Sequence, residues 1–415
     1  MDRPDQPRTG ALQRFLHAEV AGSVALLIAA LVAIAWANSP LGGRYDAFWE
    51  LTPSLPLVVV TLHEDLRHPV NDGAMTLFFF VVSLEIKREL LRGELASPRR
   101  AALPAAAAIG GMVLPAALYA AFNSGGDGAR GWGIPMATDI AFAVGVLSLA
   151  GPKVPPALKV FLLALAIVDD LGAIVVIAVF YTESLSLVAL GWAAVVIAVI
   201  VVARFLGVRR MPFYIAPGLV LWLAVLESGI HATLAGVGLA ALTPAGAVGE
   251  DDAEPPLDRL ASVLHPWSTL LVVPLFALAN SGLALSLDLV RSFTSSAVGP
   301  GVLLGLVLGK PLGILLFAWL AVRLRLAALP AGVRWAQLAA VAILGGIGFT
   351  VALFITELAF NTPGLVEEAK AGVFVASIAA GALGFLAIRL TCGPESGRHG
   401  RAPRAREGES NSSFR

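Results

Sequence analysis

The chain is organised around the segment Ala164–Ile174, which reads ALAIVDDLGAI. Apolar residues fill positions 160–179 on both sides of Asp169 and Asp170, so two carboxylates lie near the middle of a segment long enough to cross a bilayer. A charge at that depth costs roughly 2.5–3.5 kcal/mol on an insertion scale, so a pair is retained only where it is compensated or used. The segment therefore predicts a membrane span with a functional site at its centre.

The composition is that of a polytopic membrane protein. Of the 415 residues, 57% are apolar and 14% are charged, against roughly 25% charged residues in a soluble domain. The 29 basic and 29 acidic residues cancel, so net charge gives no argument for a nucleic-acid partner. The single cysteine, Cys392, excludes an internal disulfide framework. The sequence has no Gly-rich phosphate loop or His/Cys cluster, so we expect no cofactor and a transport driven by an ion gradient.

Apolar segments predict an all-α protein with about twelve membrane spans. They cover residues 20–37, 72–91, 102–122, 132–150, 157–181, 185–204, 212–228, 231–243, 263–285, 297–321, 335–358 and 369–390. We prefer an uncleaved first span to a signal peptide, because its 18 residues exceed a signal core of about 7–15. Residues 41–69 suggest a small extramembrane hairpin or surface helix, and residues 391–415 a disordered tail.

Lys and Arg residues predict the orientation, because cytoplasmic loops carry the excess. With both termini in the cytoplasm, 23 of the 29 basic residues fall inside, five fall outside and Lys310 lies within a span. This bias supports an even number of spans. The expected organisation is a cytoplasmic segment at residues 1–19, one transport domain at residues 20–390 and a cytoplasmic tail.

Asp169 and Asp170 are predicted to have different roles. Neighbours on a helix point about 100° apart, so one carboxylate can bind an ion while the other faces a partner helix. Two close carboxylates in a low dielectric also resist double ionisation, which raises the proton affinity of at least one. The pair can therefore hold a proton or a small cation in competition. The structural alternative is a pair that only caps or hydrogen-bonds a neighbouring helix.

A third carboxylate lies in the predicted span that contains IPMATDIAF, residues 134–142. Pro135 removes a backbone hydrogen bond and disfavours helix just before it, so local unwinding would expose carbonyl oxygens. Irregular backbone at that depth is tolerated where it lines a cavity or is buried in protein. A hard cation such as Na+ prefers oxygen ligands, which Asp139, Thr138 and Asp170 would supply. The alternative is a proline kink in which Asp139 is hydrogen-bonded locally.

A lysine and a glycine cluster interrupt two further spans. The Lys310 ammonium needs a counter-charge, for which the spare carboxylate of the Asp pair is the natural candidate, and it is also suited to releasing a proton. The eleventh span holds Gly345, Gly346, Gly348 and Thr350. Glycines there favour either close helix packing or unwinding.

The order of the spans favours unwinding. Spans three to five start inside and spans ten to twelve start outside, and each triplet has a Gly- or Pro-interrupted middle member. Residues 102–181 and 297–390 therefore match the pattern of an inverted-repeat transporter with its site at the midplane.

Charged residues end the second span at the predicted inner surface. Glu85 and Glu89 lie four residues apart on one helical face, with Arg88 between them, so an ion-paired cluster can guard a cytoplasmic funnel. An ordinary charged helix end is the alternative. His265 precedes Pro-Trp and titrates near neutral pH when unperturbed, which makes it a candidate modulator, and His231 lies near a predicted span end.

Seven short motifs follow one another over about residues 15–390. They are LEIKREL (84–90), ATDIAF (137–142), VDDLG (168–172), HATLAG (231–236), LHPW (264–267), GKPLG (309–313) and GGIGFT (345–350). Each motif is weak alone, but together and in this order they resemble the NhaA family of bacterial Na+/H+ antiporters.

The resemblance implies a secondary transporter and not an enzyme. It implies electrogenic exchange of cytoplasmic Na+ or Li+ for external protons across the bacterial inner membrane. It also implies two discontinuous crossing helices in spans four and eleven and a homodimer that contacts through the outer hairpin at residues 41–69. The expected partners are the lipid bilayer, Na+, Li+ and protons, with no nucleic acid.

Site roles follow from the resemblance by motif. Asp170 resembles the main Na+ ligand and proton carrier, and Asp169 resembles the partner of Lys310. Asp139 and Thr138 resemble the group at the helix crossing. The broken-helix support corresponds to Pro135, Gly345, Gly346, Gly348 and Thr350. The funnel and pH-response group corresponds to Glu85, Arg88, Glu89, His231 and His265.

One departure from the family concerns the pH response. Where the family pattern before LHPW can hold an acidic residue and a further histidine, this chain has Ala261 and Ser262. The resemblance therefore covers the transport residues but not this part of the pH switch.

Two other classes of protein remain open on the residues alone. A proton-coupled carrier of an organic solute could use the same carboxylates. An intramembrane aspartyl protease needs two aspartates on different spans, and Asp139 and Asp170 qualify by position. However, the sequence has no Gly-x-Gly-Asp motif, and Lys310 has no obvious place in that chemistry.

Overall fold

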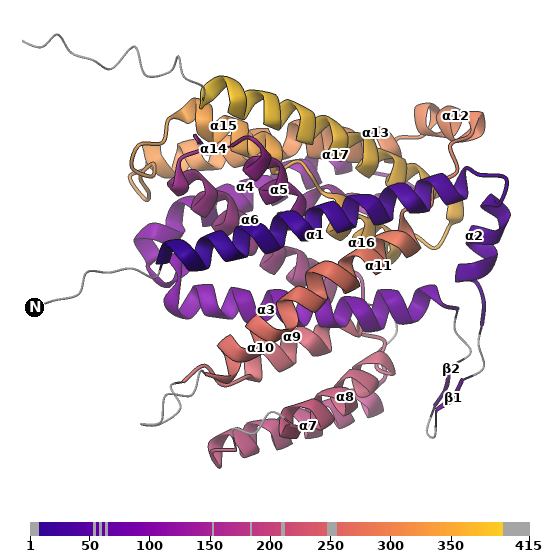
Figure 1. Cartoon of the computed structure of the whole chain (residues 1–415). Helices are drawn as coiled ribbons and strands as arrows, with labels where there is room; N and C mark the ends of the chain where they lie inside the picture. The colour runs from indigo at the N-terminus through magenta and orange to yellow at the C-terminus, as the bar shows by residue number, and fades with distance from the viewer. Residues whose placement is uncertain are drawn as a thin grey trace, which may run out of the picture.

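The computed structural model describes residues 8–52, 55–57, 60–62, 65–151, 153–182, 185–208, 212–246 and 255–392. Over these residues the chain is helical apart from one short strand pair, and the helices lie side by side in a bundle (Figure 1). In chain order the elements are α1 (Arg8–Ala37), α2 (Gly42–Trp49), β1 (Leu55–Leu57), β2 (Val60–Leu62), η1 (Pro69–Ala74), α3 (Met75–Arg92), η2 (Glu94–Ala96), α4 (Pro98–Phe122), η3 (Asp127–Met136), α5 (Ile140–Leu149), α6 (Pro156–Phe180), α7 (Leu187–Phe205), α8 (Pro212–Leu226), α9 (Thr233–Leu242), α10 (Pro256–Trp267), η4 (Ser268–Val272), α11 (Val273–Asn280), α12 (Leu287–Ser295), α13 (Val298–Leu304), η5 (Gly305–Gly309), α14 (Lys310–Arg323), α15 (Trp335–Leu344), α16 (Phe349–Ala359) and α17 (Pro363–Thr391).

The bundle has two distinct ends. The start of α1 and the end of α17 lie at one end, which we call the terminal end, while α2 and the β1–β2 pair lie at the other, the hairpin end (Figure 1). The strands pair antiparallel with Leu55 opposite Leu62. Residues 41–69 thus contain both a short helix and a hairpin, in line with the expectation for this segment.

All twelve predicted segments fall on helices. Within the described part of the chain, seven helices are long and apolar enough to cross a membrane, and the two bent pairs η3–α5 and α15–α16 raise this number to nine. The apolar helices α8 and α9 are shorter. The fold is that of a polytopic membrane protein, whereas the number of crossings stays a prediction.

Several predicted boundaries differ from the structure; the ninth predicted span, for example, runs to residue 285, whereas α11 ends at Asn280. The first helix already begins at Arg8, before the apolar run at residue 20 that marked the expected span. The predicted disordered tail begins at the last residue of α17, Thr391, and from residue 393 on it lies outside the described residues.

The surface helix at the hairpin end is fastened to the bundle by a buried tyrosine. The Tyr45 hydroxyl donates to the carbonyl oxygens of Leu278 and Ala279, at 2.8 and 2.9 Å, where α11 ends and carbonyls lack partners within the helix. Burial raises the pKa of Tyr45 to about 12, so the hydroxyl remains a donor over the physiological range. α2 is therefore held against the end of α11.

The centre of the bundle is formed by α4, α6, α14 and the bent pairs. Glycines allow α4 and α14 to approach closely, because a Cβ atom at Gly110 would lie 2.2 Å from the carbonyl oxygen of Gly313. Such small residues are typical of helix contacts in membranes, where close backbone approach drives packing. This contact brings Lys310, the first residue of α14, into the protein interior.

Candidate ion-binding site

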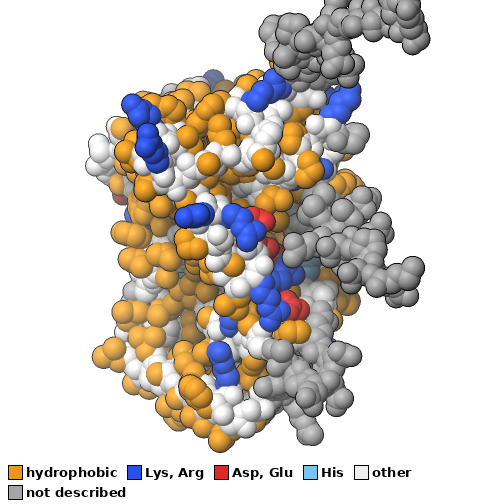
Figure 2. Space-filling model, turned by 90° about the vertical axis from the view of Figure 1, so that its left-hand side faces the viewer, with side chains coloured by type: hydrophobic (Ala, Val, Ile, Leu, Met, Phe, Trp, Pro, Cys, Tyr) orange, Lys and Arg blue, Asp and Glu red, His pale blue; other side chains and the backbone are white. Residues whose placement is uncertain are grey.

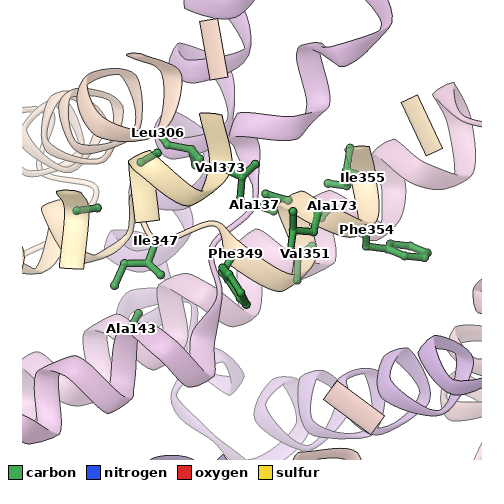
Figure 3. Packing of buried hydrophobic residues seen from close by; sticks show 14 of the residues in the cluster. Ala137, Ala143, Ala173, Leu306, Ile347, Phe349, Val351, Phe354, Ile355 and Val373 are labelled. Atoms are coloured by element: carbon green, nitrogen blue, oxygen red, sulfur yellow. The ribbon is translucent and has the colours of Figure 1, made fainter. Parts of the chain in front are cut away.

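Two helices are broken near the centre of the bundle, and the breaks face each other. The axis bends by 44° between η3 and α5 and by 47° between α15 and α16. Figure 3 shows the second break, in which the chain is extended at Ile347 before α16 carries Phe349, Val351 and Phe354. Pro135 lies just before the first break, and the predicted glycines lie in the second. The sequence features therefore stand where the helices are interrupted.

Hydrogen bonds connect the two breaks directly. The Asp139 amide donates to the Ile347 carbonyl oxygen at 2.7 Å, and the Thr138 hydroxyl donates to the Gly345 carbonyl oxygen at 2.9 Å. Thr350 donates to Oδ2 of Asp139 from its hydroxyl at 2.6 Å and from its amide at 3.1 Å. These bonds satisfy backbone groups that the unwound segments leave free, as a buried break requires.

Asp139 also caps the helix that follows it. Its Oδ1 atom accepts from the Phe142 amide at 2.9 Å at the start of α5, where helix amides lack partners. With both oxygens hydrogen-bonded and the side chain buried, the carboxylate is held in one orientation. The local hydrogen bond of Asp139 that the proline-kink alternative predicts is thus present. Asp139 also bonds to Thr350 in the second break, which that alternative does not include.

Asp169 and Lys310 form a fully buried ion pair. Lys310 Nζ lies 2.6 Å from Asp169 Oδ2, with 0% and 1% of the two side chains exposed. The ammonium also donates to the Met136 carbonyl oxygen, at the end of η3. The predicted contact between Asp169 and Lys310 is confirmed, and it joins α6 to the first break.

Asp170 faces a cavity instead of a partner side chain. The cavity has a volume of about 60 Å³ and is also bordered by Asp139 and Thr350. Within the described residues, Oδ1 of Asp170 is buried and has no hydrogen-bond partner. The remaining lining residues are Gly22, Phe78, Val81, Val82, Glu85, Ile140, Ala141, Leu163, His265, Ser268, Thr269, Val273 and Val351. A buried carboxylate oxygen without a donor can accept a proton or a cation.

The predicted oxygen ligands are only partly brought together. Asp139 and Asp170 line the same cavity, whereas the Thr138 hydroxyl is directed to the Gly345 carbonyl and Thr138 is absent from the cavity wall. Over the described ranges, no group of three or more His, Cys, Asp or Glu residues is arranged to hold a metal ion.

The predicted cluster of Glu85, Arg88 and Glu89 is not formed, and this expectation is corrected. Glu85 Oε1 lies 2.8 Å from Nδ1 of His265, and Glu89 accepts from the Glu94 amide at 3.0 Å. Among the described side chains, Arg88 forms an ion pair with neither glutamate. For Glu85 the reason is that α10 packs against α3 and places the imidazole of His265 directly at the carboxylate.

The two predicted histidines occupy different places. His265 borders the cavity of Asp170, whereas His231 Nε2 lies 3.0 Å from the Tyr181 carbonyl oxygen, just after α6 ends. Sequence reasoning missed Ser268 and Thr269, which also line the cavity from a π-helical turn. Two adjacent hydroxyls in an apolar span are a signal that could have identified them, because polar side chains within a span usually face the bundle interior or a cavity.

Buried carboxylates at a cavity beside two broken helices, with a buried Asp–Lys pair nearby, are typical of secondary ion transporters of the membrane. The comparison with protein families specifies which kind. The chain belongs to the family described as Na+/H+ antiporter 1, whose model matches residues 13–388.

Named relatives agree with this assignment. The chain is 49% identical over 387 residues to proteins named Na(+)/H(+) antiporter NhaA from Escherichia coli O1:K1, Shigella boydii serotype 4 and Shigella sonnei. The alignments cover 92% of this chain and 99% of each relative. The resemblance inferred from the motifs is confirmed, and the chain is a transporter of this family and not an intramembrane protease.

Proposed function

We propose that this chain exchanges cytoplasmic Na+ or Li+ for external protons, electrogenically, by competition of cation and proton for Asp170. The observation that carries the proposal is the buried Oδ1 atom of Asp170, which lacks a partner within the described residues and borders a cavity shared with Asp139. A carboxylate in this setting is stable either protonated or bound to a cation. Entry of protons down their gradient then expels Na+.

The neighbouring residues take supporting roles in this proposal. Asp139 is the second cation ligand, held in place by Thr350, while Thr138 keeps the two breaks together. Asp169 and Lys310 form the counter-charged pair beside the site. Gly345, Gly346 and Gly348 allow the second break to approach its neighbours; a Cβ atom at Gly346 would lie 2.5 Å from the Leu306 carbonyl oxygen.

The proposed architecture has twelve spans with both termini in the cytoplasm. The repeat units 102–181 and 297–390 each have a bent pair as middle member, which supports an inverted repeat. Figure 2 shows the terminal end of the bundle with several Lys and Arg side chains and few acidic ones, which favours a cytoplasmic location for that face. We further propose the inner membrane as location and a homodimer through residues 41–69.

A cation panel tests the proposed function. In inverted vesicles energised with a pH gradient, adding Na+ or Li+ is expected to release protons, because either ion displaces the proton from Asp170. Organic solutes are expected to cause no release. Vesicles without the protein serve as the control. Release driven by an organic solute instead of Na+ would replace this proposal with a proton-coupled solute carrier.

We expect the exchange rate to vary less steeply with pH than is usual in this family. At the position where an acidic residue can occur, the chain has Ala261, buried in an apolar cluster with Phe80, Leu84 and Leu257, so this position adds no titratable group. The Glu85–His265 pair remains at the cavity wall. Exchange measured in vesicles between about pH 6 and 9 checks this. A steep activation near neutrality would contradict it.

A further inference from the structure

A serine borders the cavity of Asp170 from a π-helical turn. Ser268 is the first residue of η4, which joins α10 to α11, and it lines the same cavity as Asp139 and Asp170. The residue is buried, with 3% of its surface exposed. Turns of this kind are rare and occur frequently at functional sites. η4 therefore places a buried hydroxyl group at the wall that the two carboxylates share.

The next residue holds this turn in place. The Thr269 hydroxyl donates to the His265 carbonyl oxygen at 2.8 Å, one turn earlier. The Thr269 methyl group packs against α1, because a Cβ atom added at Gly22 would collide with it. α1 lies beside α11 along this part of the bundle (Figure 1). These contacts fix how η4 is turned, and with it the position of Ser268.

The Ser268 hydroxyl is left to interact with the contents of the cavity. In a helix, serine and threonine hydroxyls can donate to the carbonyl oxygen four residues back, as Thr269 does to His265. No hydrogen bond of this kind joins the Ser268 hydroxyl to another described residue, although Ser268 is buried. Buried hydroxyls are nearly always hydrogen-bonded. For Ser268 the available partners are therefore water and ions in the cavity that it borders.

The carboxylate oxygens at the cavity differ in how far they are already engaged. Both oxygens of Asp139 accept hydrogen bonds, from the Phe142 amide and from the Thr350 hydroxyl. Oδ1 of Asp170 is buried and has no partner among the described residues. A hard cation is held by several oxygen ligands. A cation beside Asp170 therefore needs further oxygens, and the Ser268 hydroxyl is one that is not engaged elsewhere in the described residues.

The size of the cavity allows both groups to reach one ion. Its volume is about 60 Å³. At roughly 10–15 Å³ for each water molecule on this measure, it holds a cation together with only a few waters. The lone pairs of a hydroxyl coordinate a cation, but a hydroxyl adds no negative charge of its own. Ser268 can thus strengthen cation binding without adding a second site that takes up the proton.

We propose that the Ser268 hydroxyl is a ligand of the transported cation, next to the carboxylate of Asp170. Asp170 supplies the charge, and Thr269 keeps the turn that carries Ser268 in position. This inference rests on the proposed function, because the ligand is the Na+ or Li+ that this function exchanges.

Binding of Na+ to the purified protein tests the inference. Binding is measured by titration calorimetry with NaCl at alkaline pH, where competition by protons is weakest. Ser268→Ala is expected to raise the dissociation constant for Na+ about three- to tenfold, the usual contribution of one neutral hydroxyl. In vesicles, the apparent KM for Na+ should rise by a similar factor while the maximal rate of exchange is unchanged, because Asp170 is intact.

Two further variants show whether the oxygen atom itself is responsible. Ser268→Cys keeps nearly the same shape but replaces the oxygen by a soft sulfur, so it should lose as much affinity as Ser268→Ala. Ser281→Ala is the matched control. Ser281, just after α11, is 0% exposed and its hydroxyl has no partner among the described residues, but it is not part of the cavity wall. Its removal should leave the dissociation constant unchanged.

The outcomes separate this inference from the proposed function. If either Ser268 variant binds Na+ as tightly as the unsubstituted chain, or if Ser281→Ala loses as much affinity, the ligand role is overturned, whatever the exchange activity. If binding depends on Ser268 but Na+ releases no protons from vesicles, the proposed exchange fails and the ligand role stands. Absence of Na+ binding by the unsubstituted chain overturns both.

Discussion

Asp170→Asn is expected to abolish Na+-induced proton release in inverted vesicles. Asparagine has nearly the same shape, so the helix and the cavity wall are preserved. However, its amide neither takes up and releases a proton near neutral pH nor supplies a full negative charge to a cation. Asp139, with hydrogen bonds to both oxygens, does not replace it. Proton release is measured with a pH-sensitive dye after addition of Na+.

Asp288→Asn provides the control for this prediction. Asp288 lies on α12, its side chain is 89% exposed, and it pairs only with the exposed Arg291 among the described residues. Because exposed ion pairs contribute little, exchange by this variant should equal that of the unsubstituted chain. Normal proton release by Asp170→Asn would rule out Asp170 as the carrier, whereas equal loss in both variants would indicate a general defect.

Lys310→Leu is expected to lower the stability of the fold by roughly 3–5 kcal/mol, the usual cost of leaving one member of a buried ion pair without its partner. The Asp169 carboxylate would remain buried without a counter-charge, and the Met136 carbonyl oxygen would lose a donor. A lower melting temperature of the purified protein in detergent is the measurement.

Removing both charges tests whether the loss of stability comes from the carboxylate left without a counter-charge. The double variant Asp169→Asn with Lys310→Gln leaves no uncompensated charge, so most of the lost stability should return. Arg291→Gln removes one member of an exposed pair and should leave the melting temperature unchanged. If Lys310→Leu melts at the same temperature as the unsubstituted chain, the pair does not contribute to stability as proposed.

Much of the fold followed from the sequence alone. The hydropathy of the chain located the apolar helices, because apolar runs of this length are stable only when they are buried in lipid or protein. It did not indicate α12, which lies between two predicted spans. The same argument identified Asp169, Asp170, Asp139 and Lys310, since charges are costly in apolar surroundings and therefore conspicuous. Pro135 and the glycines of the eleventh span indicated the two breaks, because these residues weaken helices locally.

The tertiary structure decided which groups meet. The residues alone predicted that one aspartate of the pair faces Lys310, and the resemblance named Asp169. The contact itself depends on how α6 is turned between α14 and the breaks, which also places Asp170 at the cavity. The partner of Glu85 is His265, 180 residues away, and not Arg88, three residues away. Thr138 bonds to a carbonyl of the other break, and Phe354 meets rings from two other helices.

The physical reason is the range of the interactions. Helix formation and membrane insertion depend on residues within a few turns of one another, so their signals are contained in short segments of sequence. The rotation of a helix about its axis and its choice of neighbours depend on packing between segments far apart in the chain, which no local pattern encodes. The residues by themselves therefore determined that two carboxylates lie at the centre of a span, and the resemblance assigned Asp169 to Lys310. The packed bundle shows how this happens, with Asp169 bonded to Lys310 and Asp170 at the cavity.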